Sequence, residues 1–336
     1  MTATLQAPSI TVAICTRDRP AQLRRALASV TAAQSLPPLE VLVIDSRPAD
    51  DRTRQIVQTD FGQVRYVRED RPGVGFARDR ALREAHCEIV AFIDDDAVAD
   101  PDWLRAIARV MLGPDAPVAC TGRVEALVLD TEAQRLFEAN GGFDRGIGRI
   151  ELPHDAARRL HGLPAPLIAW AVSIGNACNL ALDRRAALSV GGFDGTFGVC
   201  AALPAGEDLD LIWRLISGGM TVVYEPRAMV RHEHRCTMDG LSRQLAGHQR
   251  GIVGFLTKAA IAARGTTRLQ AWLFLGWRLV KPAVRLTRRI VGRDALPAGM
   301  LLRIWWHAAA APAAYLRARQ QAAALPSVQS SSGNHG

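Results

Sequence analysis

The sequence lacks the features that mark secreted, membrane-spanning and disulfide-stabilised proteins. Its 336 residues include only six cysteines, which lie tens of residues apart without a CxxC pair. This spacing predicts reduced thiols in a core, and neither a disulfide framework nor a zinc site. Residues 1–10 lack a basic segment followed by an apolar one, and no run of about 18 apolar residues occurs anywhere. We therefore expect a cytoplasmic protein without a spanning helix.

The charge is strongly positive overall but is concentrated at one end of the chain. Hydrophobic residues make up 49% and charged residues 22% of the sequence, which is typical of a globular protein. Residues 264–336 hold eleven of the 41 basic residues and one of the 33 acidic residues, a net +10. The remaining 30 basic and 32 acidic residues leave a net −2 for the first 263 positions. A nearly neutral body with a basic C-terminal segment does not favour nucleic acid as the partner.

Short β-branched runs alternate with helical patterns in the first 125 residues. Buried strands are predicted over residues 9–15, 39–44, 64–67 and 88–93. Helices are predicted between them, over residues 21–33, 50–61 and 76–86. This alternation predicts an α/β fold with a mostly parallel, twisted sheet flanked by helices, which binds ligands at the carboxyl ends of its strands.

Polar residues gather where these predicted strands end. Thr16 and Arg17 follow the first strand, Asp45 follows the second, and three aspartates, 94–96, follow the fourth. Thr16 and Asp45 also suit a cap or a turn. Three adjacent carboxylates repel one another in a partly dry site, and a divalent cation, a sugar hydroxyl or a solvated loop would relieve this repulsion. We favour a cation or ligand site.

Six motifs in a fixed order resemble the family 2 glycosyltransferases of the GT-A fold. The resemblance covers about residues 9–235 and rests on residues 11–19 (TVAICTRDR), 39–45 (LEVLVID), 72–78 (PGVGFAR), 93–96 (IDDD), 191–194 with 206–211 (GGFD and GEDLDL), and 224–226 (YEP) leading to His232. It implies inverting transfer of a sugar from a nucleotide-diphosphate sugar to a hydroxyl of a cell-envelope glycan, a lipid-linked glycan or another glycoconjugate. It also implies Mn²⁺ or Mg²⁺ as the cofactor.

The same resemblance implies a role for each matching residue. Donor contacts fall to the polar residues of the first four motifs, namely Thr16, Arg17, Asp45, Arg78, Asp94 and Asp95. Asp96 and His232 would ligate the metal, since carboxylate and imidazole suit a hard or borderline cation. Asp208 would be the general base on the acceptor hydroxyl, and Glu207 would orient either the acceptor or that base.

Several of these residues also allow a purely structural interpretation. Glu207 and Asp208 open an amphipathic stretch and would suit any helix N-terminus. An extended HxH segment at 232–234 would point its two rings to opposite faces, so only one would reach a metal, and His232 is favoured by its place in the motif. Trp170 would either stack on an acceptor sugar or fill the core. Asn179 is a weaker acceptor contact.

The chain divides into a predicted catalytic domain over residues 1–238, a basic helical extension over 239–319 and a disordered tail over 320–336. Within residues 268–319, arginines recur at helical spacing among tryptophans, which suits either docking on an anionic membrane at the inner face of the cytoplasmic membrane or packing on the catalytic domain. Two other functions compete with glycosyl transfer: nucleotidyl transfer, for which residues 11–19 lack a phosphate-binding glycine, and nucleic-acid binding through the extension.

Overall fold

The structure is a computed structural model that describes residues 9–113, 115–157, 159–160 and 163–324, and its centre is a nine-stranded sheet. The strands of this sheet are β1 (Ile10–Thr16), β2 (Glu40–Ser46), β3 (Arg65–Glu69), β4 (Ile89–Asp94), β5 (Ala97–Ala99), β6 (Ala119–Ala126), β7 (Ile150–Leu152), β10 (Asn179–Asp183) and β11 (Val222–His232). A separate two-stranded pair consists of β8 (Arg159–Leu160) and β9 (Leu163–Pro164). The four predicted strands are therefore confirmed, each within two residues.

The sheet is mixed, although the strands that were predicted from the sequence are parallel. Its order is β3-β2-β1-β4-β10-β6-β11-β5, with β7 pairing to β11. The first four strands in this order are parallel, whereas β10 runs antiparallel between β4 and β6. The α/β class is confirmed, and the expectation of a mostly parallel sheet holds for the half of the sheet that precedes β10 and, beyond it, for the pair β6 and β11.

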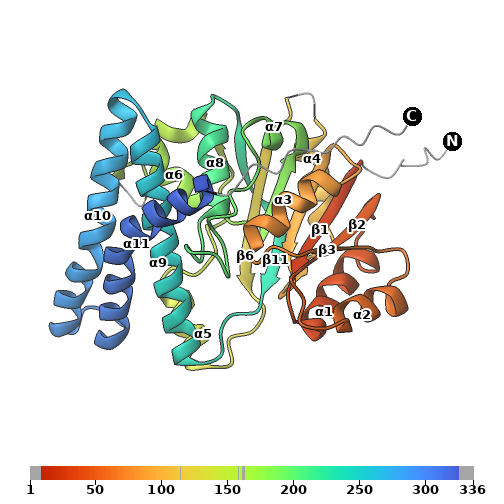
Figure 1. Ribbon diagram of the computed structural model, residues 1–336, viewed down its shortest axis with the longest axis horizontal. Coiled ribbons are helices and arrows are strands. Elements are labelled where there is room, and N and C mark those ends of the chain that lie inside the picture. The colour runs from red at the N-terminus through yellow and green to blue at the C-terminus, as the bar shows by residue number, and fades with distance from the viewer. Residues whose placement is uncertain (1–8, 114, 158, 161–162, 325–336) are drawn as a thin grey trace.

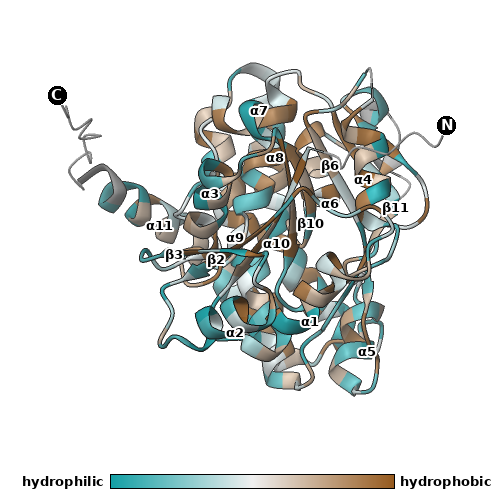
Figure 2. Cartoon of the chain, turned by 90° about the vertical axis from the view of Figure 1, so that its right-hand side faces the viewer, coloured by the Kyte–Doolittle hydropathy of each residue, from teal (hydrophilic) through white to brown (hydrophobic). Residues whose placement is uncertain are grey.

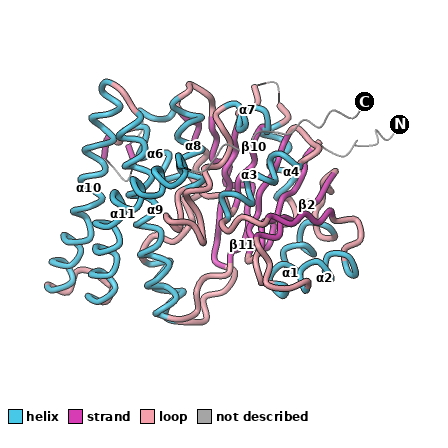
Figure 3. Tube along the Cα trace, viewed as in Figure 1, coloured by secondary structure: helices cyan, strands magenta, loops and turns pink. Residues whose placement is uncertain are grey.

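Helices cover both faces of this sheet and continue into a layer of three long helices beside it (Figure 1). The shorter helices are α1 (Pro20–Thr31), α2 (Arg52–Asp60), α3 (Val74–Glu84), α4 (Trp103–Met111), α5 (Glu132–Ala139), the 3₁₀ helix η1 (His154–Ala157), α6 (Leu167–Ile174), α7 (Arg184–Ser189) and α8 (Glu207–Ser217). The long helices are α9 (Met238–Ala262), α10 (Gly265–Ile290) and α11 (Ala298–Ala324). Figure 3 shows that loops gather between the sheet and α9.

The core forms because the buried strands are apolar on both faces. Along β1, Val12 and Ile14 belong to one buried cluster and Ala13 to another, as the alternation of side chains across a strand requires. The hydropathy colouring shows the central strands as hydrophobic and the outer helices as mixed (Figure 2). The sheet is thus fixed on both sides, and its strand ends supply a rigid base for a site.

The C-terminal extension packs directly on the catalytic part of the chain. Tyr315 of α11 is buried and stacks on Phe197, with 6.1 Å between the ring centroids. Leu275 of α10 and Leu256 of α9 lie in the same hydrophobic cluster as Phe92 of β4. The packing alternative for the extension is therefore correct for one face of these helices.

The predicted tail begins later than expected. Helix α11 continues to Ala324, because residues 313–324 are rich in alanine, with arginine and glutamine, which favour a helix. Residues 320–324 are therefore helical, and the rest of the predicted tail, residues 325–336, lies outside the described residues.

This packing gives a prediction on two adjacent positions of α11. Tyr315→Ala removes a buried ring and should lower the free energy of unfolding by about 3 kcal/mol. Leu316→Ala truncates the neighbouring exposed side chain and should change it by less than about 0.5 kcal/mol. Urea denaturation followed by circular dichroism measures both, and equal losses would contradict the packing of α11 described above.

Candidate active site

A cleft of about 510 Å³ lies at the carboxyl ends of β1 and β4. Its walls come from elements that are far apart in the sequence: the ends of β1, β4 and β11, the start of α3, the loop before β10, the start of α8 and one face of α9. The residues that line the cleft include Thr16, Arg17, Arg19, Ser46, Arg78, Asp94, Asp95, Asp96, Arg145, Cys178, Cys200, Glu207, Asp208, His232, Arg235, Gln244 and His248. A cleft therefore lies at the strand ends where the sequence predicts a ligand site.

Two arginines pair with the three carboxylates of the acidic triple. Asp94 accepts a hydrogen bond from Nη2 of Arg78 at 2.7 Å, and Arg19 donates to Asp95 at 3.1 Å and to Asp96 at 2.9 Å. Burial, with Asp96 as a neighbour, raises the pKa of Asp95 to about 6. The mutual repulsion expected from the sequence is thus relieved in part by two arginines inside the protein.

Asp96 and His232 lie next to each other, as the metal assignment requires. Nε2 of His232 is 3.1 Å from Oδ1 of Asp96. Burial opposes ionisation of both groups, but each attracts the other's charge, so the pKa of Asp96 is lowered and that of His232 is raised. A carboxylate beside an imidazole is a donor set that fits Mn²⁺ or Mg²⁺.

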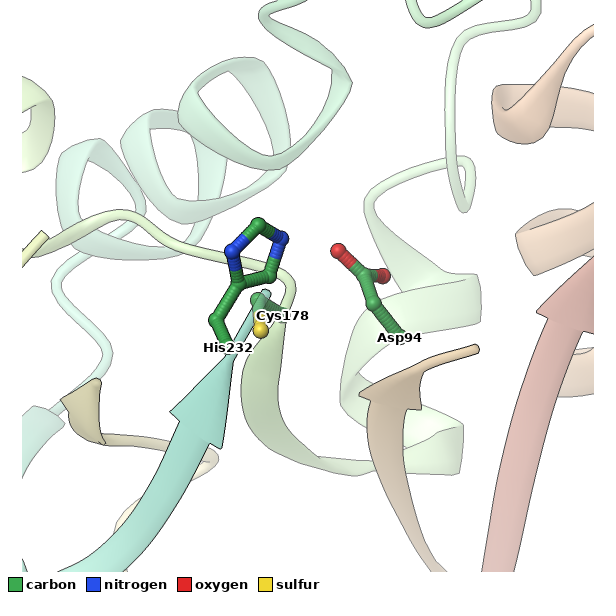
Figure 4. Close-up of side chains that lie close together, drawn as sticks. All are labelled: Asp94, Cys178 and His232. Atoms are coloured by element: carbon green, nitrogen blue, oxygen red, sulfur yellow. The ribbon is translucent and has the colours of Figure 1, made fainter. Parts of the chain in front are cut away.

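Two further potential ligands approach the same histidine. One ligand atom each from Asp94, Cys178 and His232 lies within 4.8 Å of the other two. Figure 4 shows the Asp94 carboxylate directed toward the His232 ring, with Cys178 below that ring. Burial raises the pKa of the Cys178 thiol well above its usual value, so oxygen and imidazole groups remain the better ligands for a hard cation.

The two histidines of the HxH segment meet, contrary to the sequence prediction. Nδ1 of His232 and Nδ1 of His234 are 3.2 Å apart, and Nε2 of His234 is 2.6 Å from Oε1 of Glu138 on α5. The prediction of opposite faces assumed an extended chain, but β11 ends at His232, so the alternation stops there. His234 and Glu138 consequently orient the His232 ring from behind.

Asp208 and Glu207 occupy different environments at the start of α8. Oδ2 of Asp208 accepts from the Ala177 amide at 3.0 Å, and the Asp208 side chain remains half-buried at the cleft. Glu207 is buried and paired with Arg78, and burial raises its pKa to about 7 against the effect of Arg78. Of these two carboxylates, Asp208 is therefore the one that is both held in place and accessible from the cleft.

Arg78 connects the two acidic walls of the site. Its buried guanidinium donates through Nη2 to Asp94 and through Nη1 to Glu207. The first carboxylate ends β4 and the second begins α8, so one side chain sets the spacing between them. The resemblance placed Arg78 near the base or phosphates of a donor, and the structure gives it this bridging role.

Of the other predicted donor residues, Thr16 and Arg17 line the cleft and Asp45 does not. Thr16 lines the cleft and donates to Asp95 at 2.7 Å, and Arg17 lies at the rim, 3.1 Å from the Cys200 sulfur. Asp45 is buried, accepts from the Tyr66 hydroxyl at 3.0 Å, and is not among the lining residues. Ser46 takes that place in the wall, because side chains alternate along β2.

The two predicted acceptor contacts are buried, which for Trp170 agrees with the alternative that it fills the core. Trp170 lies on the buried face of α6, where it is 3% exposed within the hydrophobic core. Asn179 is 1% exposed and accepts from Nε1 of Trp103 at 2.8 Å while donating to the carbonyls of Arg123 and Ala228. Tertiary packing therefore uses both side chains to hold the core and the sheet together.

Sequence reasoning missed several lining residues. Arg19 belongs to the TRDR motif and could have been found there, since a cation near three carboxylates is expected. Gln244 and His248 come from α9, which the predicted boundary at 238 assigned to the extension.

The prediction that all cysteines lie in a core needs correction. Cys200 and Cys236 are exposed, and Cys200 lies at the cleft rim because its loop is not part of the core.

The segment 194–206, which leads into Asp208, is held by backbone contacts between two helices. A Cβ atom at Gly75 of α3 would lie 2.7 Å from the Phe197 carbonyl oxygen, and one at Gly251 of α9 would overlap the Ala205 carbonyl. Nζ of Lys258 on α9 reaches Asp194 at 2.7 Å and Asp210 on α8 at 2.8 Å. Helix α9 therefore fixes the segment and the helix that carries Asp208.

Comparisons with known proteins match both the sequence and the fold. The family described as Glycosyl transferase family 2 matches residues 11–158, and Glycosyl transferase family group 2 matches residues 89–317. The chain is 28% identical over 240 residues to the pre-mycofactocin glycosyltransferase of Mycobacterium tuberculosis, covering 70% of this chain and 45% of that protein. It is 26% identical over 250 residues to the glucosyl-dolichyl phosphate glucuronosyltransferase of Haloferax volcanii, covering 69% and 72%. The match thus spans just under half of the mycobacterial relative.

Among solved structures, the mannosyltransferase PcManGT from Pyrobaculum calidifontis, in complex with GDP-Man and Mn²⁺, superposes with a TM-score of 0.55 at 18% identity, covering 94% of this chain and 87% of that one. The fold is therefore of the GT-A class. Together with the family match over residues 89–317, which is more than half of the chain, this establishes the family. The chain belongs to the family 2 glycosyltransferases.

The environment of Glu207 gives a prediction for the pH dependence of stability. Its pKa is raised in the folded protein from an ordinary 4.5 to about 7, so the folded state holds a proton that the unfolded state releases. The stabilisation that this provides is present below pH about 4.5 and is lost as the pH rises toward 7. Relative to Glu207→Gln, the wild type should lose stability across this range, as measured by urea unfolding at several pH values.

The exposed glutamate Glu132 on α5 supplies the matched control for this experiment. Glu132→Gln should follow the wild-type pH profile, because it removes a carboxylate that faces water. A constant difference between wild type and Glu207→Gln over the same pH range would show that Glu207 has no raised pKa.

Proposed function

We propose that this chain transfers a hexosyl group, with inversion, from a nucleotide-diphosphate sugar to an acceptor hydroxyl. One observation carries the proposal: the paired Asp96 and His232 line the same cleft as the anchored, accessible Asp208. Inversion needs one carboxylate on the face of the sugar opposite the leaving group. Asp208 is the residue in this cleft that suits that position.

The proton transfer would use Asp208 as the base. Its carboxylate accepts hydrogen bonds from the amides of Ala177 and Leu209, which hold it in one orientation. As the acceptor oxygen bonds to the anomeric carbon, its proton passes to Asp208, and the bond from that carbon to the diphosphate oxygen breaks. Glu207 does not share this task, because it is buried against Arg78, and we assign it a positioning role instead.

Asp96 and His232 would hold Mn²⁺ or Mg²⁺, which when bound neutralises charge on the diphosphate leaving group. Arg19 keeps Asp95 and Asp96 in place, and Thr16, Arg17, Asp94 and Asp95 surround the space left for the donor. The PcManGT structure, which is in complex with GDP-Man and Mn²⁺, supports binding of a metal ion together with a nucleotide-sugar.

For the acceptor, we propose a lipid-linked or cell-envelope glycan or a related glycoconjugate. The support comes from relatives: the Haloferax volcanii protein is named for a glucosyl-dolichyl phosphate substrate, and a Rhizobium meliloti relative, 25% identical, for succinoglycan biosynthesis. Both names support a saccharide-bearing molecule as the class of acceptor.

The function is tested by a donor screen followed by two substitutions. UDP-, GDP- and dTDP-sugars are scored for Mn²⁺-dependent hydrolysis and for thermal stabilisation of the protein. With the donor that responds, Asp208→Asn should keep the stabilisation but lose roughly 10²- to 10⁴-fold in turnover, because the base is gone. Asp96→Ala should lose the Mn²⁺ dependence of both readouts.

Asp130→Asn, an exposed aspartate outside the cleft, serves as the control and should behave as the wild type. Full turnover in Asp208→Asn would refute its role as base. Donor binding by Asp96→Ala with an unchanged Mn²⁺ requirement would refute the metal assignment. If no nucleotide-sugar is bound or hydrolysed by the wild type, the proposed function itself fails.

A further inference from the structure

The tryptophans of this chain divide sharply by location. Three of the seven, Trp103, Trp170 and Trp213, are buried in the catalytic part. The other four lie on α10 and α11, and all are exposed: Trp272, Trp277, Trp305 and Trp306, the last of them by 75%. Large apolar groups that remain exposed together on one part of a surface indicate a partner that covers them.

Five exposed apolar residues of α10 form a continuous stripe, which we call the outer stripe. It consists of Leu269, Leu273, Trp277, Val280 and Val284, each exposed and three or four residues from the next. This spacing places them on one face of the helix. The opposite face carries the buried Ala271 and Leu275, so the stripe points away from the catalytic core.

Helix α11 adds a second apolar surface. Leu302, Arg303, Trp305, Trp306 and Ala309 line a shallow groove whose surface is almost entirely apolar, and Arg303 is paired with Asp239 of α9. The residues again follow the helical repeat, and Ile304 and Ala308 between them are buried against the rest of the protein. Figure 1 shows α10 and α11 side by side at the end of the molecule farthest from β2 and β3.

The arginine stripe expected from the sequence does not form the outward face. Arg278 is half-buried and exchanges hydrogen bonds with Gln249 of α9, and Arg285 is paired with Asp294 at 2.6 and 2.7 Å. Lys281 is half-buried as well, and burial with these two arginines nearby lowers its pKa to about 8. The inward side of α10 is therefore cationic and the outward side apolar.

Exposed arginines lie instead at the two ends of α10. Arg264 and Arg268 lie at its start, and Arg288, Arg289 and Arg293 lie at and beyond its end. The one acidic residue after position 264, Asp294, forms an ion pair with Arg285. An apolar surface that contains tryptophans and has arginines at both of its ends matches the interface of an anionic bilayer. Tryptophan and cationic side chains concentrate at such an interface.

We propose that the outer faces of α10 and α11 dock this protein on an anionic lipid surface. No helix in the described part of the chain is both long and apolar enough to cross a membrane, so the contact would lie in the plane of the interface. A second copy of the chain fits less well, because it would bring the same arginines to the contact with no acids to meet them. The proposal is independent of the sugar-transfer function.

Vesicle co-sedimentation without any nucleotide-sugar tests the proposal. The full chain should sediment with phosphatidylcholine vesicles that contain about one third phosphatidylglycerol, and about tenfold more weakly with pure phosphatidylcholine. Trp277→Gln with Trp306→Gln should lower the partition coefficient on anionic vesicles at least about tenfold through the lost apolar contact. Arg288→Gln with Arg289→Gln should reduce the preference for anionic over neutral vesicles.

Matched controls keep these outcomes distinct from unfolding. Leu39→Gln with Ile147→Gln removes two equally exposed apolar side chains outside α10 and α11 and should leave vesicle binding unchanged. Circular dichroism should give the same spectrum for every variant, since all the changed residues are exposed. Binding that falls equally in the control and in the tryptophan variant would refute the docking surface.

Three other results would overturn the proposal. Failure of the wild type to bind anionic vesicles would remove the lipid partner. A dimer in sedimentation velocity that Trp277→Gln dissolves would make the outer stripe an interface between two copies. A gel shift with RNA or DNA at physiological salt, lost in Arg288→Gln with Arg289→Gln, would assign the arginines to nucleic acid. Because no sugar donor is present, none of these results bears on the transferase activity.

Discussion

The buried guanidinium of Arg78 is the interaction on which the geometry of the site depends. It lies between Asp94, where β4 ends, and Glu207, where α8 begins, and it is itself buried. A buried cation is tolerable only while its partners remain in place, so this contact ties the sheet to the helix that bears Asp208. Arg19 does the same for the other two carboxylates of the triple.

The second constraint comes from α9, which makes the catalytic part and the extension one structure. This helix supplies Gln244 and His248 to the cleft, and Lys258 binds both the 194–206 segment and α8. Helices α10 and α11 then pack against α9 and leave their apolar outer faces uncovered. The site and the proposed docking surface are therefore joined by a single helix, with the cleft on one side of it.

The sequence predicts what depends on neighbouring residues and fails where distant ones decide. The strands and the acidic triple follow from local patterns, whereas the association of Asp96 with His232, which lie far apart in the sequence, follows from the family resemblance. The pairing of Arg78 with Glu207 joins residues 129 positions apart, and no local pattern reveals it. The alternatives for Trp170 and for the arginines of α10 stayed open for a related reason: an aromatic or charged side chain takes its surroundings from tertiary packing, which periodicity alone does not contain.

The close backbone contacts at Gly75 and Gly251 also limit how this cleft could diversify. A side chain at either glycine would meet a backbone carbonyl of the 194–206 segment and displace it. The backbone course of this segment, several of whose side chains line the cleft, is therefore fixed as long as both glycines are kept. New donor or acceptor preferences must then arise on the walls built from side chains, those of Arg17, Arg145 and Gln244, which makes these positions the natural targets for altering specificity.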